Sequence, residues 1–79
     1  EYSPEETALR NEASKALRKY IYELKEIYAL PIMLYYLEGF TLTEISSYLS
    51  LPVSTVKWRL HSGRQLLKKI ILKGGLLND

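Results

Sequence analysis

The sequence contains no cysteine, a single histidine, His61, and a single aspartate, Asp79. Without cysteine the chain can form neither disulfides nor thiolate zinc sites, and it offers no thiol nucleophile. One histidine and one aspartate leave few groups for acid–base catalysis or metal ligation. The only glycine pair, Gly74-Gly75, follows the last helical pattern and indicates its end, not a phosphate-binding loop. We therefore expect no enzyme, no cofactor and no metal site.

Long hydrophobic runs are also missing. No apolar run approaches the roughly 20 residues that a membrane span requires, and no signal peptide is recognisable. The 79 residues are 47% apolar and 11% aromatic, which argues against disorder and fits one small domain, residues 1–79. Because the chain begins at Glu1 without a methionine, we expect it to be a fragment of a longer one.

The charge is divided unevenly along the chain. Residues 1–50 hold five Lys and Arg against eight Glu, a net charge of −3, whereas residues 51–79 hold six Lys and Arg against one Asp, a net charge of +5. The total of +2 is therefore the sum of an acidic N-terminal part and a basic C-terminal part. Such asymmetry favours a polyanionic partner.

Helix signals dominate, and no strand alternation or internal repeat occurs. The first helix, about 4–22, opens on an N-cap serine followed by proline and glutamate. Pro31 fits only the early turns of a helix, so we expect a break near 23–26 and a second helix over 26–38, closed by Gly39. With two further helices, about 42–49 and 53–73, the sequence predicts an all-α fold of four helices.

The last two helices form the most specific pattern. Thr41 and Glu44 have the spacing of a capping box, and Ile45, Tyr48 and Leu49 are expected to form the apolar face of the helix over 42–49. Ser50-Leu51-Pro52 then interrupts it, because a residue before proline is displaced from helical geometry. Two helices separated by so short a break, the second one basic, predict a helix-turn-helix.

A helical wheel divides the last helix into faces. The predicted buried face consists of Val56, Leu60, Gly63, Leu67, Ile70 and Ile71. Lys57, His61, Arg64 and Lys68 form a stripe along one flank of the exposed side, and Thr55 and Arg59 lie on the other flank. Ser54, Trp58 and Gln65 lie opposite the buried face. A helix of this kind fits the major groove of DNA, where Lys and Arg reach phosphates or guanine acceptors.

Each of these features has a plainer interpretation. A cationic stripe is usually only a solvated face, but here the charge has one sign and lies on the second helix of a helix-turn-helix. Trp58 either packs over a neighbouring segment or touches DNA, and both remain open. His61 alone has no partners for a metal, and Gly63 would permit close approach of another helix. The other tyrosines are expected at core or boundary positions, not as a base-stacking platform.

The run Leu34-Tyr35-Tyr36-Leu37-Glu38-Gly39-Phe40-Thr41, then Glu44-Ile45, and then the run from Leu51 to His61 resemble region 4 of bacterial extracytoplasmic-function sigma factors. The similarity spans about residues 20–70, and its T-V-K-x-R-L-H run is fairly specific. The resemblance implies a cytoplasmic C-terminal sigma domain that recognises the promoter −35 element. It also implies docking on the β-subunit flap of RNA polymerase and, often, control by an anti-sigma factor. We expect the isolated domain to be a monomer.

The resemblance also assigns residues to DNA. Thr55, Lys57, Arg59, His61 and Arg64 match the family motif and would face bases or backbone, while Thr41 matches the capping serine near phosphate. With the wheel, the candidate DNA-binding set is Thr41, Ser54, Thr55, Lys57, Trp58, Arg59, His61, Ser62, Arg64 and Lys68. The chain departs from the family at Trp58 (usually Ser), Ser54 (usually Gly), Ser62 (usually Arg) and Gly63 (usually Ala). The promoter sequence is therefore not transferable, and the absence of region 2 from these residues favours a fragment.

Two other classes of function fit less well. A freestanding or response-regulator-type helix-turn-helix regulator would bind as a dimer to paired half-sites. A protein-interaction module would instead dock a partner through the apolar stripe of residues 9–24 and the tail residues Ile70, Ile71, Leu72, Leu76 and Leu77. In a variant of that hypothesis, residues 66–77 lie on an anionic membrane as a basic amphipathic helix.

Overall fold

The computed structural model describes residues 15–74, and within that range it consists of helices and connecting turns without a strand. The helices are a segment over 15–21, α2 (Glu26–Ile32), the π-helical segment η1 (Met33–Leu37), α3 (Leu42–Leu49) and α4 (Val53–Gly74). The predicted all-α class and the break after the first helix are confirmed. The predicted start of that helix near residue 4 lies outside the described residues.

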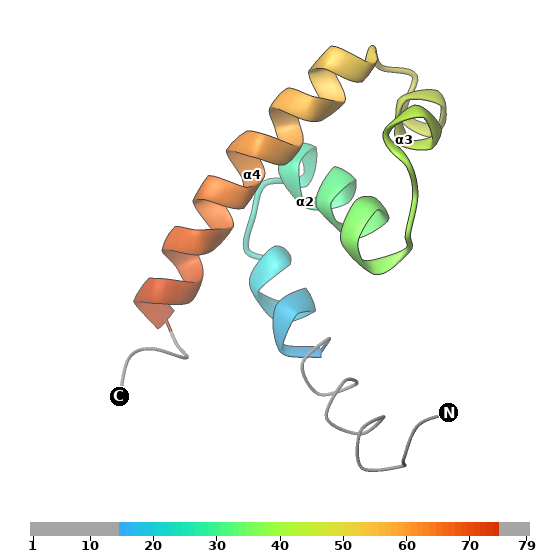
Figure 1. The fold of residues 1–79 in the computed structure, drawn as a ribbon. Coiled ribbons are helices and arrows are strands. Elements are labelled where there is room, and N and C mark those ends of the chain that lie inside the picture. The colour runs from blue at the N-terminus through green and yellow to red at the C-terminus, as the bar shows by residue number, and fades with distance from the viewer. Residues whose placement is uncertain (1–14, 75–79) are drawn as a thin grey trace, which may run out of the picture.

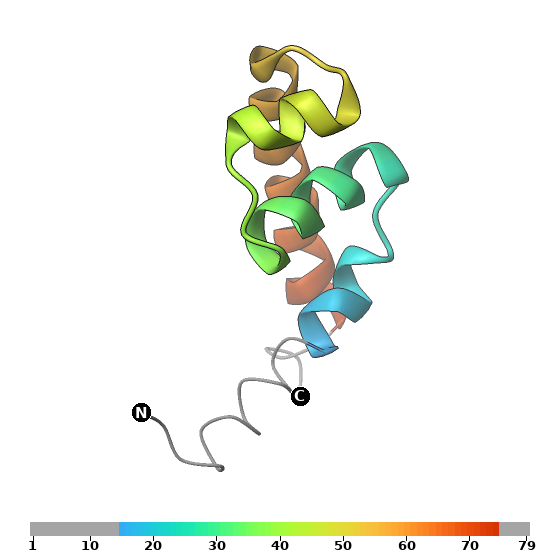
Figure 2. The same ribbon diagram turned by 90° about the vertical axis from the view of Figure 1, so that its right-hand side faces the viewer.

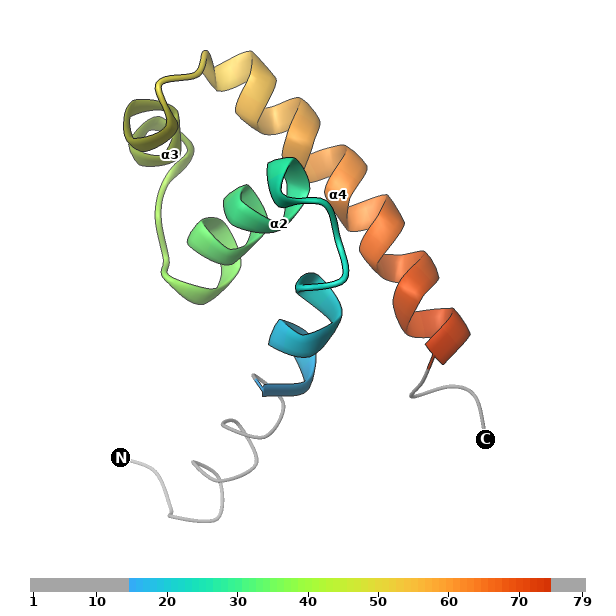
Figure 3. The same cartoon turned by 180° about the vertical axis from the view of Figure 1, so that it is seen from behind.

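The longest of the described helices, α4, packs against α2 and α3, and η1 packs against α2 and α3 (Figure 1). Following α4 from its N-terminal to its C-terminal end, the neighbouring elements are α3, then α2 with η1, and then the segment over 15–21 (Figures 2 and 3). These elements therefore follow one another along α4 in the reverse of their order in the sequence. The arrangement leaves the side of α4 that faces away from these elements exposed over its whole length.

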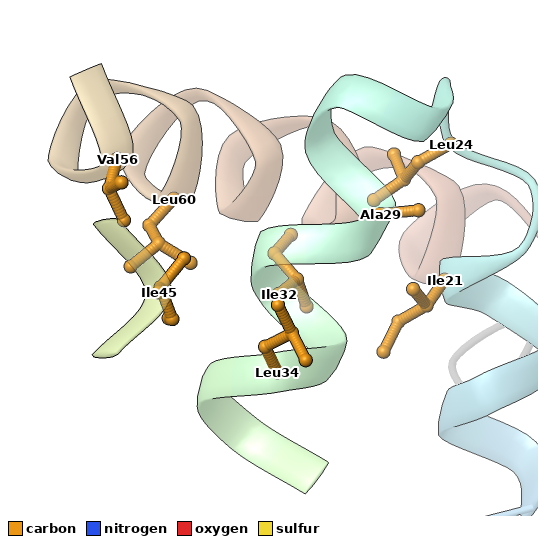
Figure 4. Close-up of a cluster of buried hydrophobic side chains, with 8 residues drawn as sticks. All are labelled: Ile21, Leu24, Ala29, Ile32, Leu34, Ile45, Val56 and Leu60. Carbon is orange, nitrogen blue, oxygen red and sulfur yellow. The ribbon is translucent and has the colours of Figure 1, made fainter. Parts of the chain in front are cut away.

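The hydrophobic core is built from every helical part of the described chain. Its buried members are Ile21, Leu24, Ala29, Ile32, Leu34, Ile45, Val56 and Leu60 (Figure 4). On α4 the predicted buried face is confirmed: Val56, Leu60 and Gly63 are buried, while Leu67, Ile70 and Ile71 are partly buried. Burying one such aliphatic side chain stabilises the fold by about 1.5–3 kcal/mol.

At Gly63, α4 approaches α2 closely. A Cβ atom added to Gly63 would lie 2.6 Å from Cδ1 of Ile32 and 3.2 Å from Cβ of Tyr28. Both distances are shorter than ordinary van der Waals contact between carbon atoms. The close helix approach that the sequence suggested at Gly63 is therefore present.

The second helix differs from its predicted form. Pro31 lies inside α2, and after Ile32 the backbone widens into the π-helical segment η1. The N–H of Glu38 donates to the carbonyl of Met33, five residues earlier, at 3.1 Å. Gly39 then ends the helix with a φ of +79°, as predicted. The apolar pattern did not distinguish the two helix types, because both keep neighbouring apolar residues on one side.

The capping box before α3 is confirmed. The N–H of Glu44 donates to Oγ1 of Thr41 at 3.1 Å, and the N–H of Thr41 donates to Oε1 of Glu44 at 2.8 Å. The assignment of Tyr48 to the apolar face of α3 was wrong, because its side chain is 66% exposed. Its ring packs edge-on against Phe40, with centroids 5.8 Å apart. Of the predicted apolar face, Ile45 is buried, and Leu49 is partly buried and packs against the core.

The turn between α3 and α4 depends on Ser50. Its backbone is left-handed, with a φ of 57° and a ψ of 48°. This conformation allows the N–H of Leu51 to donate to the carbonyl of Ser46 at 3.0 Å, and the Ser46 hydroxyl donates to the carbonyl of Leu51. The carbonyl of Pro52 then accepts from the N–H of Val56 at 3.1 Å, as α4 begins.

We expect Ser50→Gly to raise the free energy of unfolding by a few tenths to about 1 kcal/mol. The left-handed region costs a residue with a Cβ about 1–2 kcal/mol, and the greater chain entropy of glycine in the unfolded state offsets part of that gain. Urea denaturation of both proteins measures the difference. Ser47→Gly is the matched control, because Ser47 is exposed inside α3 and glycine there should cost about 0.5–1 kcal/mol. Destabilisation by both substitutions would contradict the prediction.

Candidate nucleic-acid interface

The structure leaves all ten predicted site residues accessible. Thr41 is the N-cap of α3, and the other nine lie on α4. Thr41, Ser54, Lys57, Trp58, His61, Arg64 and Lys68 are exposed, whereas Thr55, Arg59 and Ser62 are half-buried. No member of the set is removed from the surface by the packing of α4.

The charge of α4 has one sign. The helix carries six cationic residues and no carboxylate: Lys57, Arg59, Arg64, Lys68, Lys69 and Lys73. Its exposed side thus presents a positive surface that begins one turn after the helix-turn-helix turn and continues to the end of the helix. Such a surface attracts the phosphate backbone of a nucleic acid.

Two of the predicted cations meet at one cleft. Lys57 and Arg64 border a cleft of about 280 Å³ together with Leu60 of α4, Leu42 of α3 and Tyr35 of η1. The capping residue Thr41 directly precedes Leu42, so the start of α3 adjoins the same cleft. The structure therefore brings the α3 cap and the cationic flank of α4 to one side of the molecule.

Arg64 has a side-chain partner that the sequence did not indicate. Its Nη1 donates to the hydroxyl of Tyr36 at 2.6 Å, across 28 positions of the chain. Sequence reasoning assigned Tyr36 to the core or its boundary, but the side chain is 45% exposed. The only signal in the sequence was the position of Tyr36 in the family-like run of residues 34–41, three residues before Gly39.

Arg59 lies on the other flank of α4, as the wheel predicted. It borders a separate cleft of about 260 Å³ whose other lining residues come from α2, the end of α3 and the turn after it: Glu26, Ile27, Leu30, Pro31, Leu49 and Leu51. This cleft is largely apolar and includes the carboxylate of Glu26. Arg59 is thus in a different environment from Lys57 and Arg64, and the cations of α4 do not form one uniform cluster.

Trp58 packs on the domain and remains accessible. Its ring centroid lies 6.1 Å from that of Tyr28 on α2, with the two planes inclined by 45°. Even so, 56% of its surface is exposed. The indole therefore leans toward α2 while keeping a free side next to the exposed face of α4. Packing and a DNA contact, the two alternatives from the sequence, are compatible with each other.

His61 is exposed, and no group of three His, Asp or Glu side chains within residues 15–74 could hold a metal ion. Over the same residues, no helix is both long enough and apolar enough to cross a membrane.

Comparisons with known proteins agree with the geometry. The family model described as Sigma-70, region 4 matches residues 14–67. Over 66 residues the chain is 38% identical to the ECF RNA polymerase sigma factor SigW of Bacillus subtilis (strain 168), an alignment that covers 84% of this chain and 35% of that protein. The chain thus spans about a third of the length of this curated relative. No solved structure matches. With its capped helix-turn-helix and basic second helix, the chain belongs to the sigma-70 region 4 family, and its relative places it with the extracytoplasmic-function group.

Proposed function

We propose that this chain binds the promoter −35 element as region 4 of an extracytoplasmic-function sigma factor and so directs RNA polymerase to initiate transcription. The observation that carries the proposal is α4, an accessible helix with cations and no carboxylates, placed second in a capped helix-turn-helix. Family membership supports the same function. The chain would act in the bacterial cytoplasm as a binding module and not as an enzyme.

In this proposal the N-terminal half of α4 enters the major groove. Lys57, Arg64 and Lys68 on one flank bind phosphates, and Thr41 at the start of α3 lies near the same strand. Residues closer to the groove floor contact base edges or sugars: Ser54, Thr55, Trp58, Arg59, His61 and Ser62. Lys and Arg neutralise phosphate charge or bind guanine acceptors, and hydroxyl and apolar groups can also contact base edges.

We further propose that the α2 side of the domain, which adjoins the DNA-binding surface at Arg59, docks on RNA polymerase, on the flap of its β subunit, and that an anti-sigma factor can compete for this side. Ile27 is 44% exposed and borders the apolar cleft formed by α2 and the turn after α3. An apolar partner surface would cover it. Because an isolated domain of this modest charge binds DNA weakly and with strong salt dependence, polymerase would hold it at the promoter.

Selection from a pool of random DNA duplexes tests the function. The chain is equilibrated with the pool at low salt, and the bound duplexes are amplified and sequenced over several rounds. A −35 reader enriches one short motif without a repeat. Binding that persists without any enriched motif would contradict the proposal. Two copies of a motif about one helical turn apart would instead show the dimeric regulator, whose mass in solution would be doubled.

A further inference from the structure

We infer that Tyr36 positions Arg64 for phosphate binding through its side-chain hydroxyl. The inference rests on the proposed function and adds a residue to it that lies outside the helix-turn-helix. Tyr36 belongs to η1, which precedes α3, whereas the DNA-binding candidates lie on α4 and at the cap of α3. The element before the helix-turn-helix would thus determine how one of its cations is presented.

The geometry fixes one end of the Arg64 guanidinium. Nη1 of Arg64 donates to the Tyr36 hydroxyl at 2.6 Å, and both side chains are exposed. Since a guanidinium has five N–H donors in a rigid plane, this bond leaves the others free for an anion. Arg64 is therefore held without being neutralised, because the phenol accepts the hydrogen bond without carrying a negative charge.

Tyr36 is itself held by its neighbour. The rings of Tyr35 and Tyr36 meet edge to face, with centroids 4.9 Å apart and planes inclined by 82°. Tyr35 also borders the cleft that contains Lys57 and Arg64. The π-helical backbone of Met33–Leu37 thus directs two adjacent tyrosines toward α4, one as a wall of the cleft and one as a partner for Arg64.

Holding Arg64 matters because a free arginine loses conformational entropy when it binds. An exposed long side chain must give up most of its rotamers to meet a phosphate, and part of that loss is avoided when the side chain is already ordered. The hydrogen bond also keeps the guanidinium at the cleft that Lys57 borders. Both cations can then approach one phosphate group without a rearrangement of Arg64.

Tyr36→Phe tests the inference, because it removes the hydroxyl and keeps the ring. We expect the affinity of the 79-residue chain for a short fluorescein-labelled duplex of mixed sequence to fall about threefold to tenfold, the cost of ordering one long side chain on binding. In a double-mutant cycle, Tyr36→Phe should have little further effect once Arg64→Ala is present. Fluorescence anisotropy at fixed low salt measures all four proteins. Equal losses in both backgrounds would overturn the inference.

Tyr22→Phe is the matched control. Tyr22 is 65% exposed in the turn before α2 and does not border the cleft of Lys57 and Arg64, and within residues 15–74 the structure gives its hydroxyl no hydrogen bond, so removal of that hydroxyl should leave the affinity unchanged. In the chain without DNA, the ¹⁵N relaxation of Arg64 Nε should show increased motion in Tyr36→Phe and no change in Tyr22→Phe. A loss of general stability would not produce this pattern.

The two proposals fail in different ways. If the unmodified chain does not bind the duplex, or if Arg64→Ala has no effect on binding, the proposed function of this surface is wrong. If Arg64→Ala weakens binding but Tyr36→Phe changes neither the affinity nor the motion of Arg64, only the positioning role is wrong.

Discussion

Gly63→Val should lower the free energy of unfolding by about 3 kcal/mol, and Gly63→Ala by about 1–2 kcal/mol. A side chain at this position meets Ile32, which is 1% exposed, and the Cβ of Tyr28, which cannot rotate away. Overpacking of this kind costs about 1–3 kcal/mol or more, and alanine recovers up to about 1 kcal/mol through its higher helix propensity. For a small domain this is a large share of the total stability.

Urea or thermal denaturation followed by circular dichroism measures the effect. Gly74 supplies the control, because it is also on α4 and a Cβ there would lie 3.9 Å from Cε1 of Tyr20, an ordinary contact distance. Gly74→Ala and Gly74→Val should therefore change stability little. If Gly63→Val were as stable as the unmodified chain, α2 and α4 would not pack as closely as the structure shows.

Lys57→Ala combined with Arg64→Ala should reduce DNA affinity at low salt by about two orders of magnitude, since each lost phosphate contact costs on the order of tenfold. The slope of log affinity against log salt should become shallower by about 1.8, because each contact releases about 0.9 counterions. Both side chains are exposed and border one cleft, so their removal leaves the core intact.

Salt-dependent anisotropy with a labelled duplex gives the affinity and the slope, and the emission of Trp58, the only tryptophan, gives an independent signal from α4. Lys19→Ala with Lys25→Ala is the matched control, because it removes the same charge from exposed positions outside α4. The loss of log affinity in this control pair should be less than half of the loss in Lys57→Ala with Arg64→Ala. Equal effects of the two pairs would mean that only the net charge of the chain matters. An unchanged slope in Lys57→Ala with Arg64→Ala would exclude this flank as a DNA surface.

Local signals in the sequence determined the helical elements. The capping box of Thr41 and Glu44 begins α3 where it was predicted, and Pro52 separates α3 from α4, because both effects depend on residues only a few positions apart. The buried face of α4 was also predictable, since a regular helix repeats its apolar positions with a fixed period. These local rules were enough to identify the helix-turn-helix and, with its motif, the family.

Tertiary structure decided how the exposed side of α4 is organised. The hydrogen bond from Arg64 to Tyr36 and the ring contact of Trp58 with Tyr28 join residues about 30 positions apart. Such contacts depend on the angle at which α2 and η1 cross α4, and on the π-helical turn that no local pattern indicated. The sequence by itself therefore determined that α4 is an amphipathic helix whose charged side chains are all cationic. Only the packing of the other helices decided that Arg64, among these cations, is held by a tyrosine hydroxyl.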